Sequence, residues 1–142
     1  MSSTHVTGLA DLIRSSAADQ AAALAVGEVS SRELTQAHLD RIAAVDGAVG
    51  AFLNVDVEHA LSQADAADTA RKEGRVTSEL AGVPVAVKDL IVTRGQVTTA
   101  ASRILEEWVP PYDATLVRNL RAARTPILGK TNLDEFAMGG ST

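Results

Sequence analysis

The sequence predicts an α/β fold, and two observations carry that prediction. Alanine-rich segments with helical spacing alternate with short runs of β-branched residues. The longest apolar run, residues 80–92, places Val83, Val85 and Val87 at a period of two, which favours a strand. With 142 residues, 46% hydrophobic content and 3% aromatic residues, the chain is long enough for one domain, or part of one, with a core of Val, Leu, Ile and Ala.

The first seventy-odd residues are predicted to be mainly helical. A short turn over residues 9–13 precedes a helix over 17–26, which ends at Gly27 because glycine adopts the left-handed conformation of a helix C-terminus. Ser30 and Glu33 have the S-x-x-E spacing of a capping box, so they begin a further helix, which is expected to end near Asp46–Gly47.

A strand, a helix and a second strand are predicted to follow. Residues 51–55 have the composition of a short strand, and Asp56 caps a helix over 57–72. The apolar stripe of that helix lies at positions 60, 61, 64, 67 and 70, and its charged residues are expected to face solvent. The helix is long enough for parallel pairing of this strand with the strand in the apolar run.

Lys88 is placed at the end of that second strand. Burial of an ammonium group without a partner is unfavourable, so a lysine at the end of a buried strand needs an explanation. Either Lys88 is the first solvated residue after the strand, or it has a chemical role. Asp89 is not expected to pair with it, because successive side chains of a strand point to opposite faces.

The last fifty residues are predicted to combine loops with one more strand. Hydroxyl residues fill a loop over 93–102, where they form turns or bind a lysine amine. Asp113 is expected to cap a helix over 114–123, with Leu116, Val117 and Leu120 directed inward, and residues 126–129 form a strand. Asn132 and Glu135 suggest another capping box.

Composition excludes several classes of function. A net charge of -5 without a basic block argues against a free-standing nucleic-acid binder, and the absence of cysteine excludes disulfides and thiolate chemistry. His5, His38 and His59 are too scattered for a metal site, and His38 is expected to be a packed helix residue. No signal peptide and no apolar stretch of about 20 residues is present, so a cytoplasmic protein is expected.

Several motifs, in their order along the chain, resemble those of the amidase signature family. They are A-G-V-P to V-K-D over residues 81–89, T-T-A-A-S over 98–102, P-P-Y-D-A-T over 110–115 and G-K-T-N-L-D-E-F-A-M-G over 129–139, with further similarity over 29–34 and 41–46. Within the family, P-P-Y-D-A-T and T-N-L-D-E-F-A-M-G are most similar to the A subunits of glutamyl-tRNA(Gln)/aspartyl-tRNA(Asn) amidotransferases. The resemblance implies that residues 1–142 are the N-terminal portion of one amidase domain, with a helical region over about 1–75 and the start of a mixed sheet covered by helices over about 76–142.

The resemblance also implies a catalytic mechanism. The family uses a serine nucleophile, a second serine in a cis peptide and a lysine that acts through the second serine; the lysine of its V-K-D pattern maps onto Lys88. An amine that acts as a base near neutral pH needs desolvation or neighbouring cations, and the buried strand end is expected to desolvate Lys88. Met138, Gly139 and Gly140 match a stretch that lines the substrate pocket, and Ser141 matches a pocket position and neither family serine. Both catalytic serines are expected beyond Thr142, so residues 1–142 alone are expected to be inactive. No metal site is implied.

A multi-subunit enzyme follows from the same resemblance. The A subunit hydrolyses glutamine and supplies ammonia to a misacylated tRNA, which the B subunit holds and activates with ATP and magnesium; a C subunit completes the heterotrimer. No cofactor and no membrane contact are implied for this chain. The alternatives are a stand-alone amidase on another carboxamide and a truncated, non-catalytic remnant.

Two positions depart from the family pattern. Leu90 replaces a usual asparagine beside Lys88 and Asp89, which removes a hydrogen-bonding side chain. Arg124 stands where the family often has a glycine at the end of the preceding helix; if the backbone is left-handed there, the arginine costs roughly 1 to 2 kcal/mol.

Overall fold

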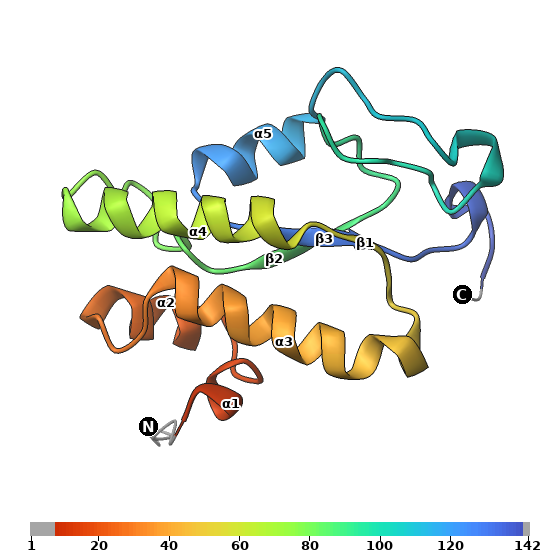
Figure 1. The fold of residues 1–142 in the computed structure, drawn as a ribbon. Coiled ribbons are helices and arrows are strands. Elements are labelled where there is room, and N and C mark those ends of the chain that lie inside the picture. The colour runs from red at the N-terminus through yellow and green to blue at the C-terminus, as the bar shows by residue number, and fades with distance from the viewer. Residues whose placement is uncertain (1–7, 141–142) are drawn as a thin grey trace.

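The protein has a three-stranded mixed sheet covered by helices, which confirms the predicted fold class (Figure 1). The computed structural model describes residues 8–140. Strand β3 (Ile127–Thr131) is central; it pairs antiparallel with β1 (Phe52–Val55) and parallel with β2 (Val85–Lys88). The predicted parallel pairing of the first two strands is therefore wrong, because β3 lies between them and runs antiparallel to β1.

The part of the chain that the structure describes contains five α-helices. They are α1 (Leu9–Leu12), α2 (Ala17–Val26), α3 (Ser31–Val49), α4 (Val57–Lys72) and α5 (Thr115–Ala122), with the 3₁₀-helices η1 (Arg103–Leu105) and η2 (Glu135–Ala137). In Figure 1 the strands lie between α5, above them, and α3, below them. Leu128 accordingly packs against α3 and α4 on one face of the sheet, and Ile127 packs against α5 on the other.

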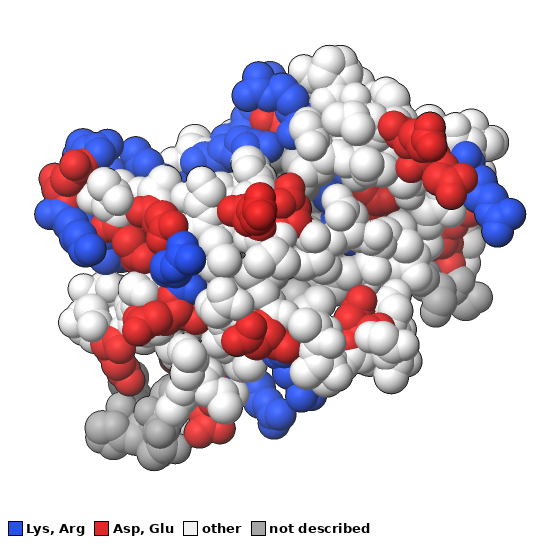
Figure 2. Space-filling model, in the orientation of Figure 1, with Lys and Arg blue, Asp and Glu red and all other residues white. Residues whose placement is uncertain are grey.

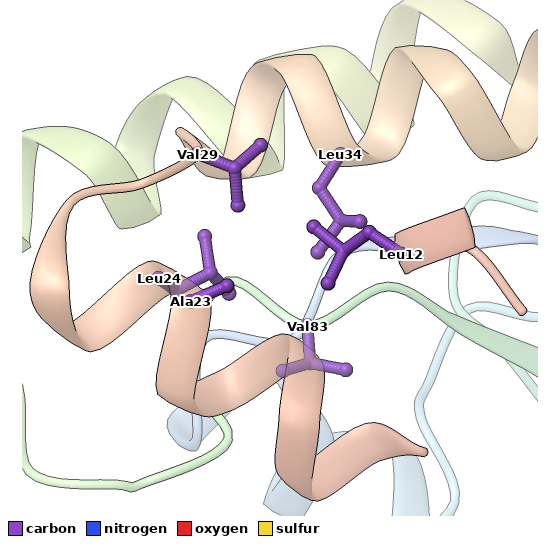
Figure 3. Close-up of a cluster of buried hydrophobic side chains, with 6 residues drawn as sticks. All are labelled: Leu12, Ala23, Leu24, Val29, Leu34 and Val83. Carbon is purple, nitrogen blue, oxygen red and sulfur yellow. The ribbon is translucent and has the colours of Figure 1, made fainter. Parts of the chain in front are cut away.

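A separate apolar cluster joins the N-terminal helices to the segment before β2. Its members are Leu12, Ala23, Leu24, Val29, Leu34 and Val83 (Figure 3). The predicted strand therefore begins later than its valines suggest: Val83 belongs to this cluster, and β2 begins at Val85, after Pro84. The cluster fixes the approach of the chain to β2.

The beginning of α3 follows the predicted capping chemistry, whereas its end does not. The Ser30 hydroxyl accepts a hydrogen bond from the Glu33 amide, and a Glu33 carboxylate oxygen accepts one from the Ser30 amide, which is the expected capping box. Helix α3 continues through Gly47 to Val49 and ends at Gly50, which has a φ of 67°. The predicted end near residue 47 is wrong because the Asp46 carboxylate holds the turn after the helix, accepting hydrogen bonds from the Ala51 and Phe52 amides.

Helix α4 matches its prediction closely and also supplies a cap. The buried alanines lie at positions 60, 64, 67 and 70. Asp68, expected to face solvent, instead accepts hydrogen bonds from the Ser31 and Arg32 amides at 2.7 and 3.0 Å. The carboxylate of α4 thus satisfies two orphan amides in the first turn of α3.

Two capping predictions in the C-terminal third are wrong. Asp113 does not cap α5: one of its oxygens accepts the Arg94 amide, and the other lies 3.2 Å from Arg121 Nε. Leu116 is exposed, whereas Val117 is buried. The Asn132 oxygen accepts the Leu133 amide instead of a helical one, because β3 extends to Thr131 and the chain turns immediately after it.

Arg124 has a left-handed backbone, with a φ of 59°. Its carbonyl accepts a hydrogen bond from the Gly82 amide at 2.8 Å, so the end of α5 is bound to the segment before β2. Replacement by glycine removes the steric penalty, and we expect Arg124→Gly to stabilise the fold by about 1 kcal/mol, measured by the urea midpoint of the helical circular dichroism signal. The control is Ala123→Gly at a φ of -74°, which should lower the midpoint; an equal decrease in both variants would contradict the account.

The burial of His38 predicts that the stability of the fold depends on pH. Burial lowers the pKa of His38 below its ordinary value, and its Nε2 atom lies 3.4 Å from Gln20 Oε1. When the pH falls below about 6.5, the unfolded chain binds a proton that folded His38 does not, so stability should fall as the pH drops below about 6.5. Urea unfolding across this range should show a flatter dependence for His38→Gln. An unchanged slope would mean that another group causes the loss.

Candidate active site

Lys88 is the last residue of β2, at the carboxyl end of the parallel pair. Val87 before it and Asp89 after it are buried, whereas the Lys88 side chain is exposed. Ala86, on the same face of the strand, is also exposed. The expected desolvation of Lys88 by a buried strand end is therefore wrong within residues 8–140, because no described segment covers this face of β2 beside it.

Asp89 points away from Lys88, as strand alternation predicts. One carboxylate oxygen accepts hydrogen bonds from the Thr99 amide and hydroxyl, at 2.9 and 2.5 Å. The other oxygen lies 3.1 Å from the amine of Lys130. Asp89 thus joins the end of β2 to the following loop and to the neighbouring strand.

Lys130 is the functional candidate that the sequence reasoning missed. Its side chain is 0% exposed, and three oxygens lie close to its Nζ: the Ile91 carbonyl at 2.8 Å, the Thr98 hydroxyl at 2.9 Å and the Asp89 carboxylate at 3.1 Å. The contacts to Ile91 and Thr98 are hydrogen bonds, and the contact to Asp89 is an ion pair that compensates the buried charge. The sequence signal that could have indicated burial of Lys130 is its position directly after the predicted strand 126–129. In the structure β3 extends two residues beyond Gly129 and includes Lys130.

Lys130 and Lys88 differ in burial and in hydrogen bonding. Burial lowers the pKa of Lys130, while the hydrogen bond and the charge of Asp89 raise it. Its amine is enclosed by protein oxygens and has no exposed surface, so a substrate or nucleophile cannot reach it within the described residues. The Lys88 amine forms no hydrogen bond or ion pair with any residue in the described range and is open to a reacting group.

Two loops pack together beyond the end of β2. The Ala100 amide donates to the Asp89 carbonyl at 3.1 Å, and the Phe136 amide donates to the Ala100 carbonyl at 2.9 Å. The Ser102 hydroxyl donates to Glu135 at 2.6 Å, which ties the same two loops a second time. The hydroxyl residues of the 93–102 loop thus do more than form turns, although the lysine that they bind is Lys130 and not Lys88.

Both loops have left-handed backbone where they meet. Ala100 and Ala101 have φ angles of 52° and 54°, and Phe136 and Ala137 have φ angles of 53° and 58°. Non-glycine residues pay an energetic penalty in this conformation and persist there only when their surroundings fix them. The hydrogen bonds to Asp89 and Ala100 supply that fixation.

The residues predicted to line a substrate pocket follow η2 directly. Met138 is 81% exposed, and Gly139 and Gly140 are exposed, so they form no enclosed pocket within residues 8–140. An added Cβ at Gly139 would lie 2.9 Å from Asp134, so this glycine allows a close approach. Their substrate contact stays a prediction, and Ser141 lies outside the described residues.

The described residues contain no cluster of three or more His, Asp or Glu that fits a metal ion. In the same range, no helix is long and apolar enough to cross a membrane. Figure 2 shows basic side chains over α5 and at one end of α4, with acidic side chains interspersed on the same face. Mixed charge of this kind is typical of a surface that does not follow a phosphate backbone.

Comparison with known sequences gives a consistent result. A sequence model of the amidase family matches residues 33–142. The A subunit of the glutamyl-tRNA(Gln) amidotransferase from Paenarthrobacter aurescens is 65% identical over 136 residues, which are 93% of this chain and 26% of that protein. The protein of the same name from Renibacterium salmoninarum is 60% identical over 134 residues, 94% of this chain and 26% of the relative. The chain thus spans about a quarter of the length of the curated relatives it matches.

Solved structures give the same result for the fold. The peptide amidase from Stenotrophomonas maltophilia is 40% identical with a TM-score of 0.81, over 86% of this chain and 25% of that one. An amidase family protein from Bacillus anthracis is 27% identical with a TM-score of 0.81, over 89% of this chain and 26% of that one. The fold of most of this chain is therefore shared with part of larger amidase structures.

Proposed function

This chain belongs to the amidase family, and from that membership we propose that it is the N-terminal portion of a single amidase domain in the glutamine-hydrolysing A subunit of a tRNA-dependent amidotransferase. The observation that carries the proposal is the identity of 60 to 65%, over more than nine-tenths of the chain, to relatives that bear the name of this A subunit. The proposed role of Lys88 is that of the base that activates a serine through a second serine. Its open amine at the end of β2 supports this role.

The proposal includes partners and cofactors of the whole enzyme. B and C subunits complete it, and the enzyme acts in the cytoplasm. The B subunit binds misacylated tRNA and ATP with magnesium, while this chain binds no cofactor. The net charge of -5 and the mixed surface support a chain that contacts protein subunits and not tRNA.

A chimera tests the proposal in a full-length context. Residues 1–142 replace the matching segment of the Paenarthrobacter aurescens protein, which is co-expressed with the other subunits of that enzyme. The chimera should convert Glu-tRNA(Gln) to Gln-tRNA(Gln) with glutamine as the nitrogen donor, within about tenfold of the parent rate. An assembled chimera that uses ammonium chloride but not glutamine would contradict the proposal.

A second candidate is a stand-alone amidase. The 40% identity and TM-score of 0.81 to peptide amidase favour it. It predicts hydrolysis of a peptide or aryl amide by the chimeric protein without its partners. Glutamine hydrolysis that requires the assembled complex favours the first function instead.

The 142-residue chain alone should release no ammonia from glutamine. Several described serines have structural hydrogen bonds: Ser16 and Ser30 cap helices, Ser31 donates to the Gly82 carbonyl, and Ser102 donates to Glu135. Loss of the nucleophile typically lowers the rate of a serine hydrolase by about 10⁶-fold. The uncovered face and edge of β2 should also make unfolding weakly cooperative. Sharp two-state unfolding together with glutaminase activity would contradict both expectations.

A further inference from the structure

We propose that the buried Lys130–Asp89 pair positions Lys88 by locking the end of β2, the turn after it and the 98–101 loop into one rigid unit. The inference rests on the proposed function of Lys88. It assigns Lys130 a positioning role and not a catalytic one, because its enclosed amine touches only protein oxygens in the described range.

The contacts of Lys130 hold three separate segments. Its amine contacts Asp89, which follows Lys88 directly, the Ile91 carbonyl in the next turn, and Thr98 in the loop beyond. The Ile91 amide in turn donates to the Lys88 carbonyl at 2.9 Å, and the Asp89 amide donates to the Thr131 carbonyl at 3.0 Å. The backbone on the C-terminal side of Lys88 is thus fixed by one buried cation and its partners.

Through Asp89, the same pair also contacts the loop that contains the left-handed residues Ala100 and Ala101. Asp89 accepts two hydrogen bonds from Thr99, and the Thr99 hydroxyl accepts one from the Ala101 amide at 3.0 Å. Ala100 and Ala101 are the left-handed residues on which η2 rests through Phe136. Loss of the lysine would remove the side-chain contacts to Asp89 and Thr98, leaving this strained loop with fewer interactions to hold its backbone.

The pair also keeps the Asp89 carboxylate away from the Lys88 amine. One Asp89 oxygen accepts hydrogen bonds from Thr99 and the other forms an ion pair with Lys130, so the carboxylate next to Lys88 in the sequence is directed away from it. A carboxylate released from this arrangement would be free to form an ion pair with the Lys88 ammonium. Lys130 therefore keeps Lys88 without an anionic partner among the described residues.

A purely structural role is the competing explanation, because removal of one partner from a buried ion pair is strongly destabilising. The experiment separates the two roles in the chimera with Lys130→Met, the double variant Asp89→Asn/Lys130→Met, and the control Asp68→Asn. Asp68 is also a tertiary carboxylate, but it caps α3 and contacts nothing near Lys88. Thermal midpoint, assembly of the complex, kcat and KM for glutamine are measured for each variant.

We expect Lys130→Met to lower kcat about 100-fold with KM within about twofold, since a small misplacement of a reacting group has this effect. Asp68→Asn should lower the thermal midpoint and leave kcat within about twofold. The double variant contains no unpaired buried charge, so it should assemble even if the single variant does not, and its kcat should stay low because Ile91 and Thr98 lack their anchor.

Normal kcat in an assembled Lys130→Met or double variant would overturn the positioning role. A loss of kcat that follows the thermal midpoint equally in Lys130→Met and Asp68→Asn would also overturn it. Lys88→Ala is measured in parallel. If that variant keeps full glutaminase activity, the proposed function of Lys88 fails, and the positioning role fails with it; if it is inactive while the Lys130 variants are normal, only the positioning role fails.

Discussion

Lys88→Arg is expected to abolish glutamine hydrolysis by the assembled chimera as completely as Lys88→Ala, by at least about 10³-fold. Arginine keeps the positive charge and most of the length of lysine, but its guanidinium does not deprotonate in the working pH range. A residue that acts as a neutral base therefore cannot be replaced by arginine. A structural cation at an exposed strand end would tolerate the change.

The chain offers a matched control for this substitution. Lys72 lies at the end of α4, is also exposed, and has no proposed role, so Lys72→Arg should leave turnover within about twofold of the parent. Ammonia release from glutamine is measured for all three variants at equal amounts of assembled complex. Near-normal turnover of Lys88→Arg would show that Lys88 is not the base.

Gly129→Ala is expected to destabilise the fold by at least about 3 kcal/mol, because an added Cβ would overlap the backbone of the neighbouring strand. The methyl carbon would lie 2.2 Å from the Asn54 carbonyl oxygen and 3.0 Å from Val55 Cα. Relief of this contact requires β1 to move away from β3 at the centre of the sheet. Lys130 follows directly in the same strand, so the candidate site would be displaced as well.

Gly47→Ala is the control for this prediction. Gly47 lies inside α3, and an added Cβ there has nothing within 4 Å. Alanine is favoured over glycine in a helix interior, so Gly47→Ala should stabilise the fold by about 0.5 to 1 kcal/mol. The two alanine variants should therefore shift the urea midpoint in opposite directions. Equal midpoints would contradict the close approach of β1 to Gly129.

Local chemistry predicted the helices well. The serine and glutamate of the capping box at Ser30, the left-handed Gly27 and the alanine stripe of α4 each depend on residues a few positions apart. Such interactions form wherever the local sequence allows them, because they do not depend on the rest of the fold. The same reasoning predicted that Arg124 would be strained if left-handed, and its φ of 59° confirms the conformation.

Interactions between distant segments were not predictable in the same way. The antiparallel placement of β1 depends on β3, which lies some seventy residues later in the chain and inserts between β1 and β2. The sequence position of Asp113 suggests a local helix cap, and that of Asp68 suggests a solvated charge. Both side chains instead accept hydrogen bonds from amides of other segments. A short polar side chain can satisfy a local or a distant donor equally well, so sequence spacing alone does not decide between them.

The candidate site illustrates the same limit. The strand pattern predicted that Lys88 and Asp89 point to opposite faces, and the burial of Asp89 beside an exposed Lys88 agrees with it. The partner of Asp89 was missed, because Lys130 is forty-one positions away and its burial depends on the pairing of β2 with β3. Two lysines with different surroundings thus lie at the end of the same pair of strands.

The most direct test of the central claim compares two nitrogen donors in the chimera that carries Lys88→Ala. Amidation of Glu-tRNA(Gln) is measured once with glutamine and once with ammonium chloride, at equal amounts of assembled complex. If Lys88 is the base of the glutaminase reaction, amidation with glutamine should fall by at least about 10³-fold, while amidation with ammonia stays within about twofold of the unmodified chimera. Amidation with glutamine that persists at the rate of the unmodified chimera would contradict the assignment of Lys88.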